Sequence, residues 1–105
     1  MYIEDFFKRG KLTAEERRDL RDVVSCPYLP TKARYLADLQ EAGFGDIQFD
    51  DVSALWAAFT AERAAAYKAA AAPIASLDTF YSTVASLFAA GRLGEEECTK
   101  TWLDD

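Results

Sequence analysis

Apolar side chains recur at helical spacing in four segments of the chain, and a proline or a glycine closely follows each of them. The segments are residues 13–25, 31–42, 53–72 and 76–90. In the first, Thr13 and Glu16 fit a capping box, in which each side chain satisfies a free backbone N–H at the helix start. In the second, apolar residues at every third or fourth position end at Gly43, a typical left-handed helix stop. The pattern predicts four helices.

Strand signals are weaker. Residues 46–50 alternate polar and apolar side chains, so Ile47 and Phe49 would share one face of a short strand. Residues 2–9 are ambiguous between a strand end and a helical turn. The three glutamates at 95–97 suit the first turn of a helix and are too acidic for a buried central strand. Because two isolated strands are marginal in water, we predict a mainly-α fold of four to five helices with at most one or two short β-strands.

Length and composition indicate a single domain spanning residues 1–105. Half of the residues are hydrophobic and 13% are aromatic, which excludes a disordered tail. Twelve Lys and Arg against 18 Asp and Glu give a formal net charge of -6, which disfavours nucleic acids and anionic lipids as partners. No apolar run approaches the ~20 residues of a membrane span, so we expect no direct membrane insertion. We expect a soluble protein, either cytoplasmic or inside an organelle after removal of a targeting peptide.

Reactive groups do not follow the spacing of a catalytic or metal site. Histidine, the commonest general base and metal ligand, is absent. Cys26 and Cys98 lack CxxC spacing, and we expect ordinary small apolar residues at both positions rather than a pair. Adjacent acids such as Asp50 and Asp51 are explained by solvated turns. We therefore predict no catalytic, cofactor-binding or metal-ligating residue.

The aromatic side chains allow two interpretations. They could line a pocket for a cationic or methylated ligand. Because most of them fall on apolar helix faces, we favour positions in the core and at an interface. Arg63 and Tyr67, at i and i+4 on the 53–72 helix, could hold an anion together, but we favour a surface stacking pair.

Several short motifs follow one another in an informative order. They include Tyr2-Ile-Glu-Asp-Phe-Phe7, Leu12-Thr-Ala-Glu-Glu-Arg17, Tyr35-Leu-Ala-Asp-Leu-Gln-Glu-Ala-Gly-Phe44, Asp46-Ile-Gln-Phe-Asp-Asp-Val52 and Leu87-Phe-Ala-Ala-Gly-Arg-Leu-Gly94. This order resembles the C-terminal half of class I S-adenosylmethionine-dependent methyltransferases, especially the group that acts on small amines such as phosphoethanolamine. The resemblance covers residues 1–94.

The resemblance implies that the cofactor-binding half is missing. In the family, the fifth strand ends near the counterpart of Glu4 and Asp5, and a seventh strand inserts between the fifth and the sixth. The glycine motif and the acidic ribose residue precede the counterpart of Met1, so we expect no cofactor and no enzyme activity from this chain alone. After Gly94 the family continues with an apolar strand, whereas residues 95–105 form a divergent acidic tail. The expected fold is a mostly helical remnant of an α/β methyltransferase half.

Two functions are compatible with these features. The first is a non-catalytic accessory or structural subunit that contacts other protein subunits through apolar helix faces. The residues expected at that interface are Trp56, Phe59, Phe80, Phe88, Trp102 and Leu103. The alternative is the substrate-capping half of an S-adenosylmethionine-dependent small-molecule N-methyltransferase, completed by another chain. The residues expected in its substrate pocket are Tyr2, Phe6, Tyr28, Arg63 and Tyr67.

Overall fold

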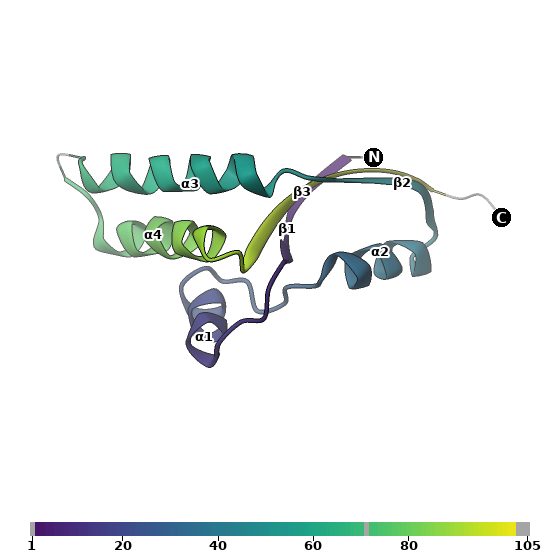
Figure 1. Cartoon of the computed structure of the whole chain (residues 1–105), viewed down its shortest axis with the longest axis horizontal. Helices are drawn as coiled ribbons and strands as arrows, with labels where there is room; N and C mark the ends of the chain where they lie inside the picture. Colours follow the sequence, from purple (N-terminus) through teal and green to yellow (C-terminus); the bar gives the residue numbers. More distant parts are fainter. Residues whose placement is uncertain (1, 71, 103–105) are drawn as a thin grey trace.

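The computed structural model of the chain describes residues 2–70 and 72–102, which form four helices and three strands (Figure 1). In chain order the elements are β1 (Tyr2–Lys8), α1 (Ala14–Asp22), α2 (Lys32–Glu41), β2 (Phe44–Asp51), α3 (Ser53–Lys68), α4 (Ala75–Ala89) and β3 (Leu93–Trp102). The four predicted helices are confirmed, with ends that differ from the predicted ones by a few residues.

The helix ends follow the predicted capping signals. The backbone N–H of Glu16 donates to Thr13 Oγ1 over 3.1 Å, and the backbone N–H of Thr13 donates to Glu16 Oε1 over 2.9 Å, so the capping box of α1 is confirmed. Thr31 caps α2 with its hydroxyl oxygen in the same way. Gly43 and Gly91 follow α2 and α4 at φ values of 100° and 72°, which glycine adopts without a steric penalty.

The three strands form one sheet in the order β1–β3–β2, so the last strand of the three in the chain lies between the other two. β3 is antiparallel to both neighbours. Phe6 on β1 is paired with Glu95 on β3, and Phe49 on β2 is paired with Cys98. Directly paired residues share a face of a sheet. Phe6 and Glu95 therefore lie on one face, and Phe49 and Cys98 lie on the other.

The prediction of a mainly-α fold is wrong, because residues 95–97 lie in the central strand of a three-stranded sheet. Main-chain hydrogen bonds to strands on both sides hold β3, and these bonds do not depend on side-chain polarity. Glu97 is half-buried in a row with Glu4 and Asp50, whose side chains are exposed. Solvation of this face accounts for Glu97, whereas Glu95 and Glu96 are buried in the strand, 3% and 0% exposed.

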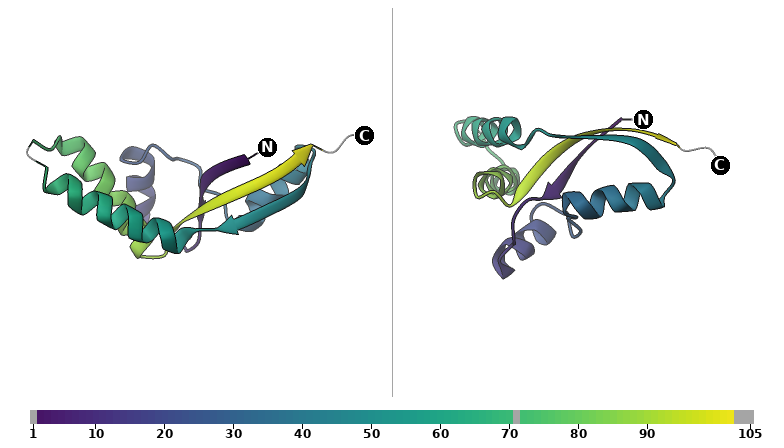
Figure 2. Two further views of the ribbon diagram at one scale, coloured as in Figure 1. Left: turned by 90° about the horizontal axis from the view of Figure 1, so that it is seen from above. Right: turned by 45° about the vertical axis from the view of Figure 1, so that its right-hand side comes forward.

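The helices leave the sheet covered unevenly. α2 runs along one face of the sheet (Figure 2). On this face the rings of Phe7 and Tyr35 pack edge-on against Phe49. α3 and α4 pack side by side in a hairpin that projects from the sheet and gives the molecule extents of 55 × 27 × 20 Å (Figure 1). Among the described residues, no helix is long and apolar enough to cross a lipid bilayer.

The main core lies where α1, α4 and the start of β3 meet. Its buried residues are Leu12, Leu20, Val24, Val84, Leu87, Phe88 and Leu93. Phe6 and Trp56 are partly buried against this cluster. The ring of Phe6 meets Phe88 edge-on at a centroid distance of 5.8 Å, so the core reaches the edge of the sheet at β1.

Candidate functional site

The residues predicted for a substrate pocket are divided between two parts of the molecule. Phe6 on β1 and Tyr28 between α1 and α2 line one hollow at the edge of the sheet. Arg63 and Tyr67 lie on α3, in the projecting hairpin (Figure 1). The side chain of Tyr2 lies outside the described part of the structure. Of the five residues, the described structure brings Phe6 and Tyr28 together.

Arg63 and Tyr67 make contacts within the α3–α4 hairpin. The guanidinium carbon of Arg63 lies 4.5 Å from the centre of the Tyr81 ring and 5.4 Å from that of Phe59, as in cation–π pairs. The Tyr67 ring packs edge-on against Tyr81, and its hydroxyl oxygen accepts a hydrogen bond from the backbone N–H of Ile74 over 2.9 Å. Both residues thus contact the Tyr81 ring and join α3 to α4.

The residues predicted for a partner interface differ in exposure. Phe59 is 47% exposed on α3, one helical turn after Leu55, which is 68% exposed. Trp56 and Phe80 are partly buried against the core, and Phe88 belongs to the core itself. The side chain of Trp102 and all of Leu103 lie outside the described part of the structure. Phe59 and Leu55 therefore form the exposed apolar pair on this helix.

Two hollows flank the outer edge of β1, and Asp5 and Phe6 line both of them. Among the described strands, β1 pairs only with β3. At one end of this edge, the backbone N–H of Lys8 donates to the carbonyl oxygen of Pro30 over 2.7 Å. The N–H of Phe6 donates to Asp5 Oδ1 over 2.9 Å. The Asp5 carboxylate thus takes the place that a carbonyl group of a neighbouring strand would occupy.

The first hollow, which we call the acidic hollow, has a volume of about 250 Å³ and is lined by Glu4, Asp5, Phe6, Trp56 and Glu95. Glu95 is 3% exposed. Its Oε2 atom is buried and accepts no hydrogen bond from a described group. None of the ion pairs formed by the described residues includes Glu95. A buried carboxylate oxygen without a donor is costly, so this side chain requires an explanation.

Electrostatics in the acidic hollow disfavour the ionised form of Glu95. Burial raises the pKa of Glu95 to about 7, and the negative charges of Glu4, Asp5, Glu96 and Glu97 act in the same direction. The Glu95 carboxyl therefore titrates near neutral pH. A cation brought into the hollow would stabilise the ionised form.

The second hollow, of about 210 Å³, is on the α2 side of β1 and contains polar groups that are paired within the chain. The Tyr28 hydroxyl donates to Asp38 Oδ2 over 3.1 Å. Burial and a hydrogen bond with Glu96 raise the pKa of Tyr35. Burial and then the charge of Asp5 raise the pKa of the Cys26 thiol, which keeps the thiol protonated and a weak nucleophile.

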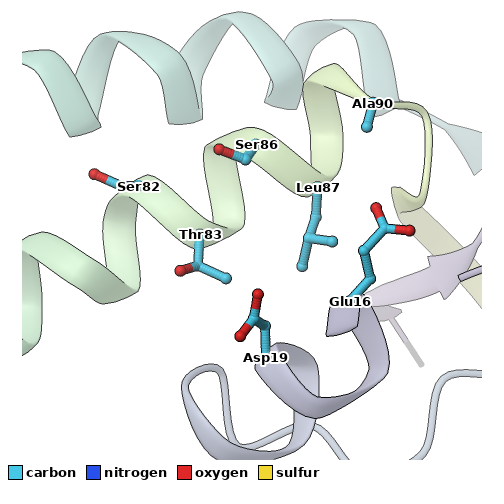
Figure 3. A pocket seen from close by; sticks show the side chains of 7 residues that line it. All are labelled: Glu16, Asp19, Ser82, Thr83, Ser86, Leu87 and Ala90. Carbon is cyan, nitrogen blue, oxygen red and sulfur yellow. The ribbon is translucent and has the colours of Figure 1, made fainter. Parts of the chain in front are cut away.

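A groove between α1 and α4, of about 320 Å³, carries polar side chains from both helices (Figure 3). Glu16 points toward the end of α4, and Asp19 lies below Thr83 (Figure 3). Glu16 accepts hydrogen bonds from the backbone N–H of Thr13 and from Arg92 Nε, so its carboxylate already has two strong donors. We assign this groove to helix packing.

The acidic hollow is not visible in the sequence, because its residues come from three separate segments. By local pattern, Glu95 suits a helix start and Trp56 falls on an apolar helix face. The register that pairs Phe6 with Glu95 brings them together. The described residues contain no group of three or more His, Cys, Asp or Glu side chains that could hold a metal ion. Cys26 and Cys98 are not joined in a disulfide bond.

No protein-family model matches the chain. No curated protein matches it in sequence. Among solved structures, the chain is similar to phosphoethanolamine N-methyltransferase 2 of Haemonchus contortus, in complex with phosphomonomethylethanolamine and S-adenosylhomocysteine. The TM-score is 0.74 at 12% sequence identity.

This similarity covers 98% of the chain and 26% of the methyltransferase, so the chain spans about a quarter of the length of that enzyme. It shows a methyltransferase-like fold and does not extend to activity. The order β1–β3–β2, with the last strand inserted between the other two, is the arrangement implied for the fifth, seventh and sixth strands of that family.

Proposed function

We propose that the chain is a non-catalytic accessory subunit of a larger protein assembly, built on a methyltransferase-like fragment, and that its partner docks at the outer edge of β1. The observation that carries the proposal is the position of β1, which pairs with another described strand on one side only; on its outer side a single bridge joins Lys8, the last residue of β1, to Thr31. An unpaired strand edge is a template for another chain.

Charge supports docking by a different protein rather than by a second copy, and an exposed apolar pair could extend the interface. The outer strand carries Glu4 and Asp5, and the chain has a net charge of -6, so two copies of this edge would repel each other. The exposed pair Leu55 and Phe59 on α3 adds apolar surface that a larger interface could cover.

The alternative is the substrate-capping half of an S-adenosylmethionine-dependent N-methyltransferase that another chain completes. The similarity in fold to the methyltransferase of Haemonchus contortus favours it. In this case the partner would be a cofactor-binding half, and the complex rather than the isolated chain would bind S-adenosylmethionine. Calorimetric titration of S-adenosylmethionine into the isolated chain and into the purified complex distinguishes the two functions. If the complex binds the cofactor and transfers a methyl group, and this chain contacts the substrate, the alternative function holds in place of the accessory role.

The docking site can be tested by blocking the strand edge. Residues two apart in a strand point their backbone N–H groups the same way, so Glu4 shares the outward direction of Phe6. Proline is tolerated at an edge position with an outward N–H, and it blocks addition of a strand. Glu4→Pro should abolish co-purification of the partner from native extract, whereas Asp50→Asn, which removes an exposed charge on β2 and leaves the edge of β1 intact, should retain most of it.

Circular dichroism and the thermal midpoint of each variant serve as folding controls. The double variant Leu55→Ser and Phe59→Ser tests the α3 surface independently. A wild-type chain that elutes as a monomer from native extract, with no stoichiometric partner, would contradict the proposed function. If the α3 variant loses the partner while Glu4→Pro retains it, the interface lies on α3 rather than at β1.

A further inference from the structure

We infer that the acidic hollow receives a lysine or arginine side chain from the strand that the partner adds to β1. This inference rests on the proposed function, and it specifies the chemistry of the partner at the docking edge. It draws on three observations: a buried carboxylate oxygen without a donor, aromatic walls that the core holds in place, and the geometry of an added strand.

Glu95 provides the first observation. Acids on an outer strand can be explained as protection against aggregation, and Glu4 and Asp5 fit that role. Glu95 lies on the central strand, 3% exposed, so it gives no such protection. Its Oε2 lacks a donor among the described residues, although the residue lines a hollow that opens beside β1. A cationic donor from a partner would satisfy this atom.

The size and walls of the hollow indicate which cation fits. The described acids do not converge as a metal site would require. A volume of about 250 Å³ accommodates an ammonium or guanidinium group with part of its alkyl stem. Phe6 and Trp56 supply aromatic surface for that stem and for cation–π contact.

The aromatic walls are held in place by the core. Phe88 contacts both rings: it meets Phe6 edge-on at 5.8 Å and stacks with Trp56 at a centroid distance of 6.4 Å. Phe88 itself is 4% exposed. Because these rings are fixed before binding, little side-chain entropy is lost when a cation enters.

Strand geometry connects the hollow to the docking edge. A residue of the added strand that pairs with Phe6 or Glu4 would share their face of the sheet, which is also the face of Glu95. Its side chain would therefore project over the acidic hollow. The Asp5 carboxylate would release the N–H of Phe6 to a carbonyl oxygen of the new strand.

The site can be probed without the partner. n-Butylammonium reproduces the end of a lysine side chain, and n-butanol and butyrate provide neutral and anionic controls of similar size. Titrated into the full chain and followed by amide and indole NMR, n-butylammonium should give saturable shifts at Phe6, Trp56 and Glu95. Butanol and butyrate should not. Glu95→Gln should weaken the response about tenfold, and Asp50→Asn, on the same face but outside the hollow, should weaken it less than about twofold.

Equal responses to butylammonium and butanol, or an unchanged response in Glu95→Gln, would overturn the inference. The same variants separate its failure from that of the proposed function. If Glu4→Pro abolishes partner binding while Glu95→Gln and the charge reversal Glu95→Lys retain it, the accessory role stands and the cation site fails. If Glu95→Lys is folded by NMR and loses the partner, the cation site is supported.

Discussion

Arg92, in the segment that leads into β3, donates a hydrogen bond from Nε to Oε1 of Glu16 on α1 over 3.0 Å. The same oxygen accepts the backbone N–H of Thr13 at 2.9 Å. The hydrogen bond from Thr13 and, to a smaller extent, the Arg92 guanidinium lower the pKa of Glu16 despite partial burial. One carboxylate oxygen therefore closes the first helix and anchors the segment that begins the central strand.

Replacing Glu16 should destabilise the chain more than an exposed ion pair would. Glu16→Gln weakens the contacts to Thr13 and Arg92 and should lower the free energy of unfolding by about 1 kcal/mol. Urea denaturation measures the loss. Asp22→Asn provides the control. Arg21 and Asp22 form an exposed ion pair, and loss of this pair should change the free energy of unfolding much less. Equal losses in the two variants would contradict the anchoring role of Glu16.

Glu95 should make stability depend on pH. Its pKa in the folded chain is about 7, above the ordinary value of 4.5. The folded state therefore binds a proton more tightly than the unfolded state does, and the free energy of unfolding should fall as pH rises from about 4.5 to 7. Glu95→Gln should remove this slope and raise stability at pH 8 by on the order of 2 kcal/mol. Urea titrations at several pH values test this, and a Glu95→Gln variant that keeps the wild-type slope would refute it.

Gly91 and Gly94, on either side of Arg92 and Leu93, should respond differently to replacement by alanine. A Cβ atom at Gly94 would lie 2.5 Å from Cε1 of Phe7, so Gly94→Ala must displace a buried ring and should cost about 1 to 3 kcal/mol. At Gly91 no atom lies within 4 Å of the added Cβ, and the cost of about 1 kcal/mol comes from the positive φ. Thermal denaturation of both variants distinguishes crowding from backbone strain. A larger loss at Gly91 would argue against the paired position of Gly94 and Phe7.

The two thiols should react slowly and at different stages. Cys98 is fully buried, and burial raises the pKa of the half-buried Cys26 thiol. At a pH of about 7.5, Ellman's reagent should label Cys26 more slowly than free cysteine and should label Cys98 only after unfolding. The variants Cys26→Ser and Cys98→Ser assign the two phases. Rapid labelling of Cys98 in the native chain would be inconsistent with its position at the centre of the sheet.

Helices could be predicted from the sequence because their signals are local. The capping box at Thr13 and Glu16 and the stop at Gly43 act within a few residues, and the structure places helix ends at both. The alternation at 46–50 likewise indicates β2, which extends to Phe44–Asp51. The spacing of apolar residues is therefore sufficient to predict an element whose signals lie within a few residues of one another in the sequence.

The central strand could not be predicted in the same way, because its stability comes from residues distant in the chain. Glu95 to Glu97 carry no apolar alternation, and it is pairing with β1 and β2 that makes this segment a strand. The acidic hollow depends on the same pairing, since Phe6 and Glu95 meet only through the register. The family resemblance implies a strand in this position, whereas the acidity of the segment, taken alone, argues against one.

This pairing also has a consequence for synthesis. Tyr2 pairs with Thr99, so β1 leaves the ribosome long before the strand that it requires. Synthesis adds about 5 to 20 residues per second, so β1 remains unpaired for several seconds before β3 is made. During this time the α3–α4 hairpin can fold from local contacts. Glu4 and Asp5 would keep the nascent strand soluble during that interval.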